Sequence, residues 1–217
     1  MIDLHTHSLL SDGDLLPAEL VRRAEVIGYR TVAITDHADS SNLDWIIPRL
    51  IQVSQDLNAH GKVLVIPGIE LTHLPPTLIV PLTTRARALG AQLVLVHGET
   101  IVEPVAPGTN HQAIQAGVDI LAHPGLISEE DVILAREKGV FLEITSRQGH
   151  SLSNGHVARL AQRAGAAMVL NTDSHLPGDL ISREKALKVV LGAGLLLEDF
   201  DRMLENSRRL LPGPKEV

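Results

Sequence analysis

The amino-acid sequence predicts an α/β barrel in which seven parallel strands alternate with helices. Seven short apolar runs, rich in β-branched residues, recur along the 217 residues, as is typical of parallel strands covered on both faces. Each run ends in a histidine, an aspartate or a glutamate, and successive ends lie 20 to 33 residues apart. An eight-unit barrel uses roughly 31 residues for each strand and helix, so this length accommodates seven units more easily than eight.

The predicted strands and the polar residues that follow them occur in a regular order. The first run, Met1–Leu4, precedes His5-Thr6-His7, whose two histidines share a face if the segment is extended. The last run, Met168–Asn171, precedes a similar pair, Asp173 and His175. Between them lie Thr31–Ile34 before His37, Val63–Ile66 before Glu70, Leu93–Val96 before His97, Val118–Ala122 before His123, and Val140–Leu142 before Glu143.

Helices are expected in the intervals between the strands, where start and stop signals occur. The first spans Pro17–Ile27, with proline in its first turn and Gly28 after it. Ser128 is expected to cap a helix with an acidic first turn that ends before Gly139. The other predicted helices are Asp44–His60, Pro81–Leu89, Ser153–Ala164, Ser182–Leu191 and Leu197–Leu211, the last stopping at Pro212-Gly213-Pro214; Pro75-Pro76 and Pro104–Pro107 are expected to be loops.

The carboxyl ends of parallel barrel strands meet on one rim, where barrels of this type place their active sites. The residues at the strand ends resemble those of the polymerase and histidinol phosphatase (PHP) superfamily, in its stand-alone phosphoesterase branch. The resemblance covers nearly the whole chain and rests on His5-x-His7 with Ser11-Asp12-Gly13, Thr35-Asp36-His37, Gly68-Ile69-Glu70, Val96-His97, Ala122-His123-Pro124-Gly125, Leu142-Glu143-Ile144 and Asp173-Ser174-His175.

This resemblance implies one domain over residues 1–217, folded as a distorted seven-stranded TIM-like barrel with a cluster of two or three metal ions. Some phosphatases of the family carry histidine at the position of Asp12, where the local sequence varies. The implied metal ligands are His5, His7, Asp12, His37, Glu70, His97, His123, Asp173 and His175.

Six imidazoles and three carboxylates without a thiolate form a donor set that suits divalent Zn, Mn or Fe, and they are too many for one ion. Three divalent ions would leave about two surplus positive charges after the carboxylates and a bridging hydroxide, which a phosphate monoester dianion would neutralise. Such ions can lower the pKa of bound water to about 7, so a metal-bridging hydroxide is the expected nucleophile. The chain has no cysteine and no Gly-x-Ser-x-Gly motif, so a covalent nucleophile has little support.

Four residues near the implied ligands have expected supporting roles. Arg147 and His150 follow the sixth strand and are expected to bind the substrate phosphate, with a surface salt bridge or a hydrogen bond to a ligand as alternatives. Asp3 has the same parity as His5 and is expected to face the barrel interior and hold a ligand imidazole. Glu143 is expected to act similarly, with direct metal ligation as the alternative.

Other histidines and polar residues receive weaker assignments. His60, His111 and His156 lie away from the strand ends and are expected on the surface. His73 is ambiguous, because it is near Glu70 but in a proline-bounded loop. Glu99 and Thr100 follow His97, at the end of the fourth predicted strand, and are candidate pocket residues.

The composition, with 44% hydrophobic and 21% charged residues, indicates an ordinary single globular domain. No apolar stretch reaches the roughly 18 residues of a membrane span. The position of His5-x-His7 near the start is expected to leave no room for a signal peptide. The sequence contains no cysteine, so no disulfide is possible, and a cytoplasmic location is expected.

The expected function is hydrolysis of a small phosphomonoester, such as one resembling histidinol phosphate. Net charge −7 and the lack of a dense Lys/Arg run disfavour nucleic acid as a partner, although a nuclease or phosphodiesterase would use the same cluster. The ligand pattern disfavours an amidohydrolase-like metal enzyme, and the presence of every implied ligand disfavours a non-catalytic, metal-stabilised scaffold. The sequence leaves open the ester, the native metal, the acid that protonates the leaving group and the oligomeric state.

Overall fold

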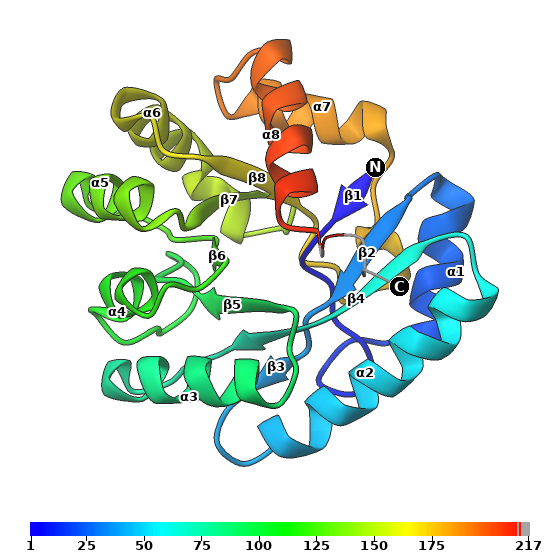
Figure 1. Cartoon of the computed structure of the whole chain (residues 1–217). Helices are drawn as coiled ribbons and strands as arrows, with labels where there is room; N and C mark the ends of the chain where they lie inside the picture. The colour runs from blue at the N-terminus through cyan, green and yellow to red at the C-terminus, as the bar shows by residue number, and fades with distance from the viewer. Residues whose placement is uncertain (212, 214–217) are drawn as a thin grey trace.

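Parallel strands form the centre of the computed structural model, which describes residues 1–211 and 213, and helices surround them (Figure 1). Every strand pairing described is parallel, and the barrel strands follow the order β1-β2-β4-β5-β6-β7-β8. The strands are β1 (Ile2–Asp3), β2 (Thr31–Ile34), β3 (His37–Ala38), β4 (Leu64–Leu71), β5 (Leu93–His97), β6 (Ile120–Ala122), β7 (Phe141–Thr145) and β8 (Met168–Asn171). The prediction of a seven-stranded α/β barrel is confirmed, and the two-residue β3, which pairs with β4, is an addition to it.

The outer layer consists of the helices that connect the strands. Its α-helices are α1 (Pro17–Ile27), α2 (Leu43–His60), α3 (Pro76–Ala88), α4 (Thr109–Gln115), α5 (Glu129–Lys138), α6 (Asn154–Ala164), α7 (Arg183–Gly192) and α8 (Leu197–Arg209), and its 3₁₀ helices are η1 (His150–Ser153) and η2 (Pro177–Asp179). Within residues 1–211, no helix is both long enough and apolar enough to cross a membrane.

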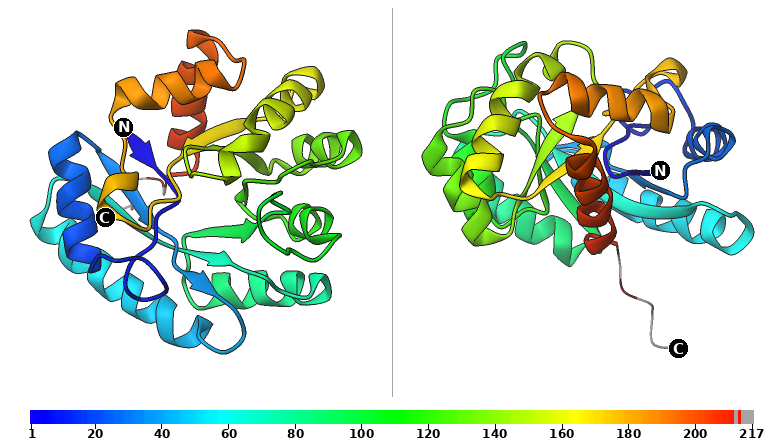
Figure 2. Two further views of the ribbon diagram at one scale, coloured as in Figure 1. Left: turned by 180° about the vertical axis from the view of Figure 1, so that it is seen from behind. Right: turned by 90° about the horizontal axis from the view of Figure 1, so that it is seen from above.

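The barrel closes where the chain continues beyond β1 and β8. The backbone N–H of Asp173 donates to the carbonyl of His5 at 2.9 Å, and the N–H of His7 donates to the carbonyl of Ser174 at 2.8 Å. Figures 1 and 2 show the first strand beside the last from opposite sides. Closure therefore places the histidine pair of the first strand next to the Asp173 and His175 pair of the last.

Two apolar layers position these strands. Alternate residues of a strand point to opposite faces, so one set fills the barrel and the other packs under the helices. Inside the barrel lie Ile2, Leu4, Ala33, Ile66, Leu93, Leu95, Ile120, Phe141 and Val169. The outward neighbours, among them Val32, Val65, Val94, Leu121 and Leu142, join the larger cluster beneath the helices.

Helix starts follow the predicted capping residues closely. Helix α1 has the predicted bounds, and the hydroxyls of Ser128 and Ser182 accept hydrogen bonds from the N–H groups of Asp131 and Lys185, which caps α5 and α7. Helix α8 ends two residues before the predicted Leu211. Pro212 and Pro214 of its predicted stop signal lie outside the described residues.

Two predictions about the helices are wrong. Helix α3 begins at Pro76 and not at Pro81, because a proline fits the first turn, where its missing N–H is not required, and Pro81 is accommodated inside the helix. The segment expected to be a loop at Pro75-Pro76 therefore contains the helix start. Helix α4 was not predicted at all, since its seven residues carry no side-chain cap and follow Gly108.

Gly125 allows two rim loops to approach each other closely. Its φ is +62°, and a Cβ atom there would lie 1.8 Å from the carbonyl oxygen of Glu99. Gly139, after α5, has a similar φ of +71°, but no heavy atom lies within 4 Å of the corresponding Cβ position. The two glycines therefore share a left-handed conformation and differ in the available space.

We predict that Gly139→Ala costs about 1–2 kcal/mol of unfolding free energy, because alanine is strained in the left-handed conformation. Gly125→Ala should cost about 1–3 kcal/mol more, because the backbone of the neighbouring loop must also move. Urea denaturation of both variants measures the difference. Equal losses at the two positions would contradict the close approach at Gly125.

Candidate metal centre

The nine implied ligands come together at the carboxyl rim of the barrel. Each contributes to at least one group of three or more side chains whose donor atoms lie within 4.8 Å of one another. They come from the extension of β1 (His5, His7), the loop after it (Asp12), β3 (His37), β4 (Glu70), β5 (His97), the residue after β6 (His123) and the segment after β8 (Asp173, His175).

Glu70 lies at the centre of this cluster and is fully buried. Its Oε2 atom is 3.4 Å from Nε2 of His5, 3.6 Å from Nε2 of His7 and 2.7 Å from Nδ1 of His37. Its Oε1 atom is 3.5 Å from Nε2 of His123. One carboxylate therefore faces four imidazoles from the first strand's extension, β3 and the segment after β6.

Asp173 is a second buried carboxylate among the same imidazoles. Its Oδ1 atom is 3.6 Å from Nε2 of His5 and 3.3 Å from Nε2 of His7, and its Oδ2 atom is 3.6 Å from Nε2 of His123. Its φ of +53° is rare for a residue other than glycine, so the surrounding fold holds the carboxylate in a strained backbone position.

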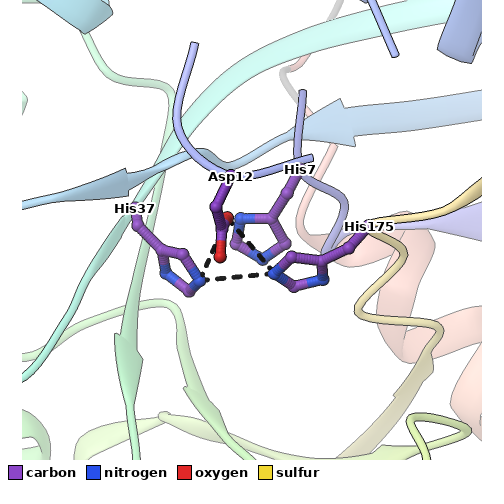
Figure 3. Close-up of side chains that lie close together, drawn as sticks. All are labelled: His7, Asp12, His37 and His175. Carbon is purple, nitrogen blue, oxygen red and sulfur yellow. Dashed lines mark hydrogen bonds and ion pairs between the residues drawn. The ribbon is translucent and has the colours of Figure 1, made fainter. Parts of the chain in front are cut away.

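Four side chains form the outer part of the cluster (Figure 3). Oδ1 of Asp12 lies 3.6 Å from Nε2 of His37 and 3.3 Å from Nε2 of His175. Those two ring nitrogens are 3.4 Å apart, and the ring of His7 lies behind both, with centroid separations of 4.1 Å. Asp12 is more exposed than the other three, so this group opens toward solvent.

Several buried donor atoms of the cluster make no hydrogen bond within the described part of the chain. Among them are Nε2 of His5, both ring nitrogens of His7, Oε1 of Glu70, Nδ1 of His123 and Oδ1 of Asp173. Buried polar atoms are almost always paired, because leaving them without a partner costs free energy. These atoms come together from different segments of the barrel, so divalent metal ions between them would satisfy the whole set. The residues present therefore fit the implied metal cluster.

Two groups of the cluster, His7 and Glu70, have the ionisation state that metal ligation requires. Burial and the neighbouring His37 hold the pKa of His7 well below its ordinary value, so its imidazole is neutral, as metal ligation requires. Burial opposes ionisation of Glu70, but the charges of His5 and His37 outweigh it and hold its pKa well below the usual range. The site thus contains a neutral imidazole beside an ionised carboxylate.

Glu143 lies directly behind the cluster. Its Oε1 atom is 2.9 Å from Nδ1 of His5 and accepts a hydrogen bond from the side chain of Asn171, and its Oε2 atom accepts from the backbone N–H of His123. This contact orients the His5 ring so that Nε2 faces Glu70. A carboxylate behind a ligand imidazole is the arrangement expected of Glu143.

Asp3 does not hold an imidazole, so that expectation is wrong. It accepts hydrogen bonds from the hydroxyl and the N–H of Thr172 and from the N–H of His5, and burial raises its pKa to about 6. Strand β1 ends at Asp3, while Ile2 and Leu4 face the barrel interior. The alternation of a regular strand therefore does not continue from Asp3 to His5, and Asp3 fixes the backbone between the first and last strands.

Arg147 and His150 line a cavity of about 210 Å³ above the cluster, together with Asp12, His37, His97 and His175 among others. Nη1 of Arg147 donates to Asp179 at 2.8 Å, so the salt bridge expected as an alternative exists, and the side chain still faces the cavity. A larger hollow of about 500 Å³ lies between α6 and α8, but it contains no histidine and is remote from the cluster's residues.

His150 is buried beside the predicted ligands. Its ring stacks on that of His123, with centroids 4.2 Å apart, and its Nδ1 atom lies 2.6 Å from the hydroxyl of Thr100. Burial and the charge of His123 lower its pKa to about 3. His150 therefore lies in the wall of the cavity and contacts the proposed ligand His123.

Sequence reasoning missed Glu103, which follows β5. Its carboxylate contacts Nε2 of His97 and of His73 at 3.1 Å each, and Nε2 of His150 at 3.3 Å. The hydrogen bond with His97 lowers the pKa of Glu103 to about 2. A carboxylate six residues beyond a strand end, in a proline-containing loop, has no periodicity that could place it.

Asp36 and Thr72 were also missed as supporting residues. Asp36 accepts hydrogen bonds at 2.7 Å from the hydroxyls of Ser8 and Ser11, which braces the loop that carries Asp12. The hydroxyl of Thr72 lies 2.7 Å from Nδ1 of His37. Their signal was their place beside the motifs, since Asp36 directly precedes His37.

The weaker assignments have mixed outcomes. Glu99 accepts hydrogen bonds from the N–H groups of Gly108 and Asn110 and so braces its own loop, and it does not line the cavity described above. Three histidines lie outside the cluster as predicted: His60 contacts the carbonyl of Asp56, His111 contacts Asp131, and His156 contacts the carbonyl of Ile127.

The sequence profile of the PHP domain matches residues 3–147, which is more than half of the chain. This protein belongs to the PHP domain family. A protein of Methanocaldococcus jannaschii, described as uncharacterized, is 49% identical over 99% of this chain and 97% of its own length. A probable phosphatase of Shewanella frigidimarina is 25% identical over 97% of this chain and 91% of its own length.

Several solved structures have a fold similar to that of this PHP protein. A chain of an archaeal ribonuclease P with mature tRNA superposes with a TM-score of 0.73 at 15% identity, over 97% of this chain and 89% of that one. The histidinol phosphate phosphatase of Lactococcus lactis, complexed with zinc, L-histidinol and phosphate, gives a TM-score of 0.62 at 17% identity, over 90% and 94%. At these identities the likeness establishes the shared barrel fold alone.

We predict that chelator-treated protein is stabilised by added Zn²⁺ or Mn²⁺, because the ions would bind only the folded cluster. At a free ion concentration 100 times the dissociation constant, the gain is about 2.7 kcal/mol for each site. Thermal unfolding across a metal titration measures it, and elemental analysis should give at least two equivalents. An unfolding temperature that does not respond to either metal would contradict a preformed centre.

A second prediction separates the clustered histidines from the others. His37→Ala and His123→Ala should each lower bound metal, since each removes a donor from the cluster. His60→Ala and His156→Ala are the controls and should leave metal content unchanged. Elemental analysis after equilibrium dialysis compares all four variants, and comparable losses in every one would show that position at a strand end does not define a ligand.

Proposed function

We propose that this protein is a metal-dependent phosphoesterase that hydrolyses a small phosphomonoester. The observation that carries the proposal is the buried cluster at the barrel rim, where several imidazole and carboxylate atoms have no hydrogen-bond partner among the described residues. Six imidazoles and three carboxylates suit two or three ions of Zn, Mn or Fe. The proposed ligands are His5, His7, Asp12, His37, Glu70, His97, His123, Asp173 and His175.

When bound, divalent ions would lower the pKa of a water molecule and stabilise the charge that develops during phosphoryl transfer. The chain itself contributes the orientation of the donors. Glu143 fixes the ring of His5, and Thr72 and Glu70 together fix Nδ1 of His37, so that its Nε2 faces Asp12. These contacts hold the donor atoms in place before substrate arrives.

Arg147 is the proposed binding residue for the phosphate oxygens. Asp179 engages one nitrogen of its guanidinium and also accepts hydrogen bonds from the N–H groups of His175 and Leu176, so Asp179 fixes Arg147 beside the metal centre. A guanidinium has five N–H donors, and those not facing Asp179 can bind an anionic oxygen in the cavity. His150, also in this cavity, is the second proposed contact.

The comparisons support a phosphate ester as the substrate class. A relative that matches nearly the whole chain is named a probable phosphatase, and the histidinol phosphate phosphatase of similar fold was solved with zinc, L-histidinol and phosphate. A cavity of about 210 Å³ suits a small ester. An ester resembling histidinol phosphate is therefore the proposed substrate type, and a cytoplasmic location remains a prediction from the sequence.

A nuclease is the second candidate, because a barrel of the same fold occurs in a ribonuclease P assembly. The net charge of −7 opposes it, since nucleic-acid binding depends on cationic surfaces that replace counterions. A non-catalytic, metal-stabilised scaffold would use the buried donor atoms but would not need the cavity beside them that Arg147 and His150 line.

We predict that small phosphomonoesters are hydrolysed faster than single-stranded DNA in the presence of Zn²⁺ or Mn²⁺. Arg147→Ala should lower kcat/KM for the monoester. The loss corresponds to about 1.5 to 3 kcal/mol of transition-state binding energy, because a charge-assisted contact is removed. Steady-state kinetics measure both effects, with metal content determined in parallel.

Arg22→Ala is the control, since Arg22 also forms an ion pair with a carboxylate, that of Glu25, but far from the rim. Its kcat/KM should equal that of the parent. Faster hydrolysis of DNA would favour the nuclease, whereas an unchanged kcat/KM in Arg147→Ala would remove Arg147 from the site.

A further inference from the structure

Two side chains at the mouth of the cavity, His73 and Glu103, are not among the nine proposed ligands. His73 follows β4 and Glu103 follows β5, so they reach the mouth from neighbouring strands. Both are partly exposed, whereas the proposed ligand His97, which contacts Glu103, is buried. The three residues form a further group whose donor atoms lie within 4.8 Å of one another.

The spacing of these atoms suits a shared metal ion. Oε2 of Glu103 lies 3.1 Å from Nε2 of His73 and 3.1 Å from Nε2 of His97. Ligands bound tetrahedrally to zinc at about 2.0–2.1 Å are separated by about 3.3 Å, so little movement would be needed. Two imidazoles and one carboxylate with an open fourth position are also a recurrent ligand set for catalytic zinc.

The backbone conformation of His73 is unusual, and it places the imidazole beside Glu103. Only three residues other than glycine have positive φ among residues 1–211, namely His73 at +51°, His123 at +27° and Asp173 at +53°. The other two belong to the proposed ligand set. Such conformations persist only where the surrounding structure enforces them, and they concentrate at functional sites.

Glu103 and His97 are held in place as well. The loop that carries Glu103 is braced by Glu99, which accepts hydrogen bonds from the N–H groups of Gly108 and Asn110. Nδ1 of His97 lies 3.2 Å from the carbonyl of Gly98, which leaves Nε2 directed at Glu103. Hydrogen bonds and backbone conformation therefore hold the three donor atoms close together.

Charge at the mouth points the same way, an argument that rests on the proposed phosphatase function. The carboxylate of Glu103 lines the cavity through which a phosphate dianion would enter, and an acidic group at this place is unfavourable for an anionic substrate. A cation bound by Glu103 would cancel the repulsion. The carboxylate is thus consistent with an anionic substrate if a metal ion accompanies it.

We propose that His73, His97 and Glu103 form an entrance site for a divalent transition metal ion. Nε2 of His97 can bind only one ion, so the ion at the entrance site would be the one that His97 ligates. It would be the outermost ion of the cluster, because its other ligands, His73 and Glu103, are partly exposed. A fourth coordination position would be open to the cavity that these residues line. The remaining eight proposed ligands hold the inner ions.

The test is titration of Zn²⁺ into the chelator-treated full-length protein, followed by calorimetry and by elemental analysis at a fixed free Zn²⁺ concentration. Glu103→Gln and His73→Ala should each weaken one equivalent at least tenfold and leave the inner equivalents bound. His111→Ala is the matched control, because His111 forms a partly exposed contact with Asp131 at 2.8 Å away from the rim, and it should bind as the parent does.

Unchanged stoichiometry and affinity in both variants would overturn the entrance site, and so would the loss of every equivalent in either. Titration with Co²⁺ provides an independent readout, since the visible absorption of the outermost ion should weaken in both variants. Phosphomonoester hydrolysis by the parent is measured separately. A parent without that activity would overturn the proposed function, while the metal stoichiometry would still decide the entrance site.

Discussion

The backbone hydrogen bonds that join the extensions of β1 and β8 are the constraint on which the rest of this structure depends. The N–H of Asp173 binds the carbonyl of His5, and the N–H of His7 binds the carbonyl of Ser174. These bonds hold Asp173 beside His5 and His7, whose ring nitrogens also face Glu70. Without this closure, the barrel would keep its apolar layers but would lose one wall of the cluster.

Closure also explains why polar groups accumulate behind the cluster. Asp3 ties Thr172 to the start of the chain, and Glu143 ties His5 to Asn171 and to the backbone of His123. Both carboxylates are buried, and each has several hydrogen-bond partners. Several atoms that face the centre have no such partner within the described part of the chain. The contrast between a satisfied outer layer and an unsatisfied centre is what a metal-binding site requires, because the ions complete the pairing.

Much of the fold could be predicted because its signals are local. Continuous apolar runs identified the barrel strands, and the serine caps at Ser128 and Ser182 located two helix starts. Helix α4 has neither a cap nor sufficient length, and it was missed. A start at Pro76 was missed because a proline pair predicts a loop as readily as a first helical turn. These errors lie where local preferences allow two outcomes and tertiary packing selects one.

By itself, the sequence determined which side chains reach the rim, because the ends of parallel strands meet on one side of a barrel. That rule brought His5, Glu70, His123 and Asp173 together correctly from distant positions. Only the tertiary structure decided where Asp3 and Glu103 point. The chain leaves regular strand geometry after Asp3, and Glu103 lies in a loop shaped by its own hydrogen bonds to Glu99 and by the close approach of Gly125. Strand periodicity fixes direction only while the strand lasts, so beyond its end the direction of a side chain depends on the fold.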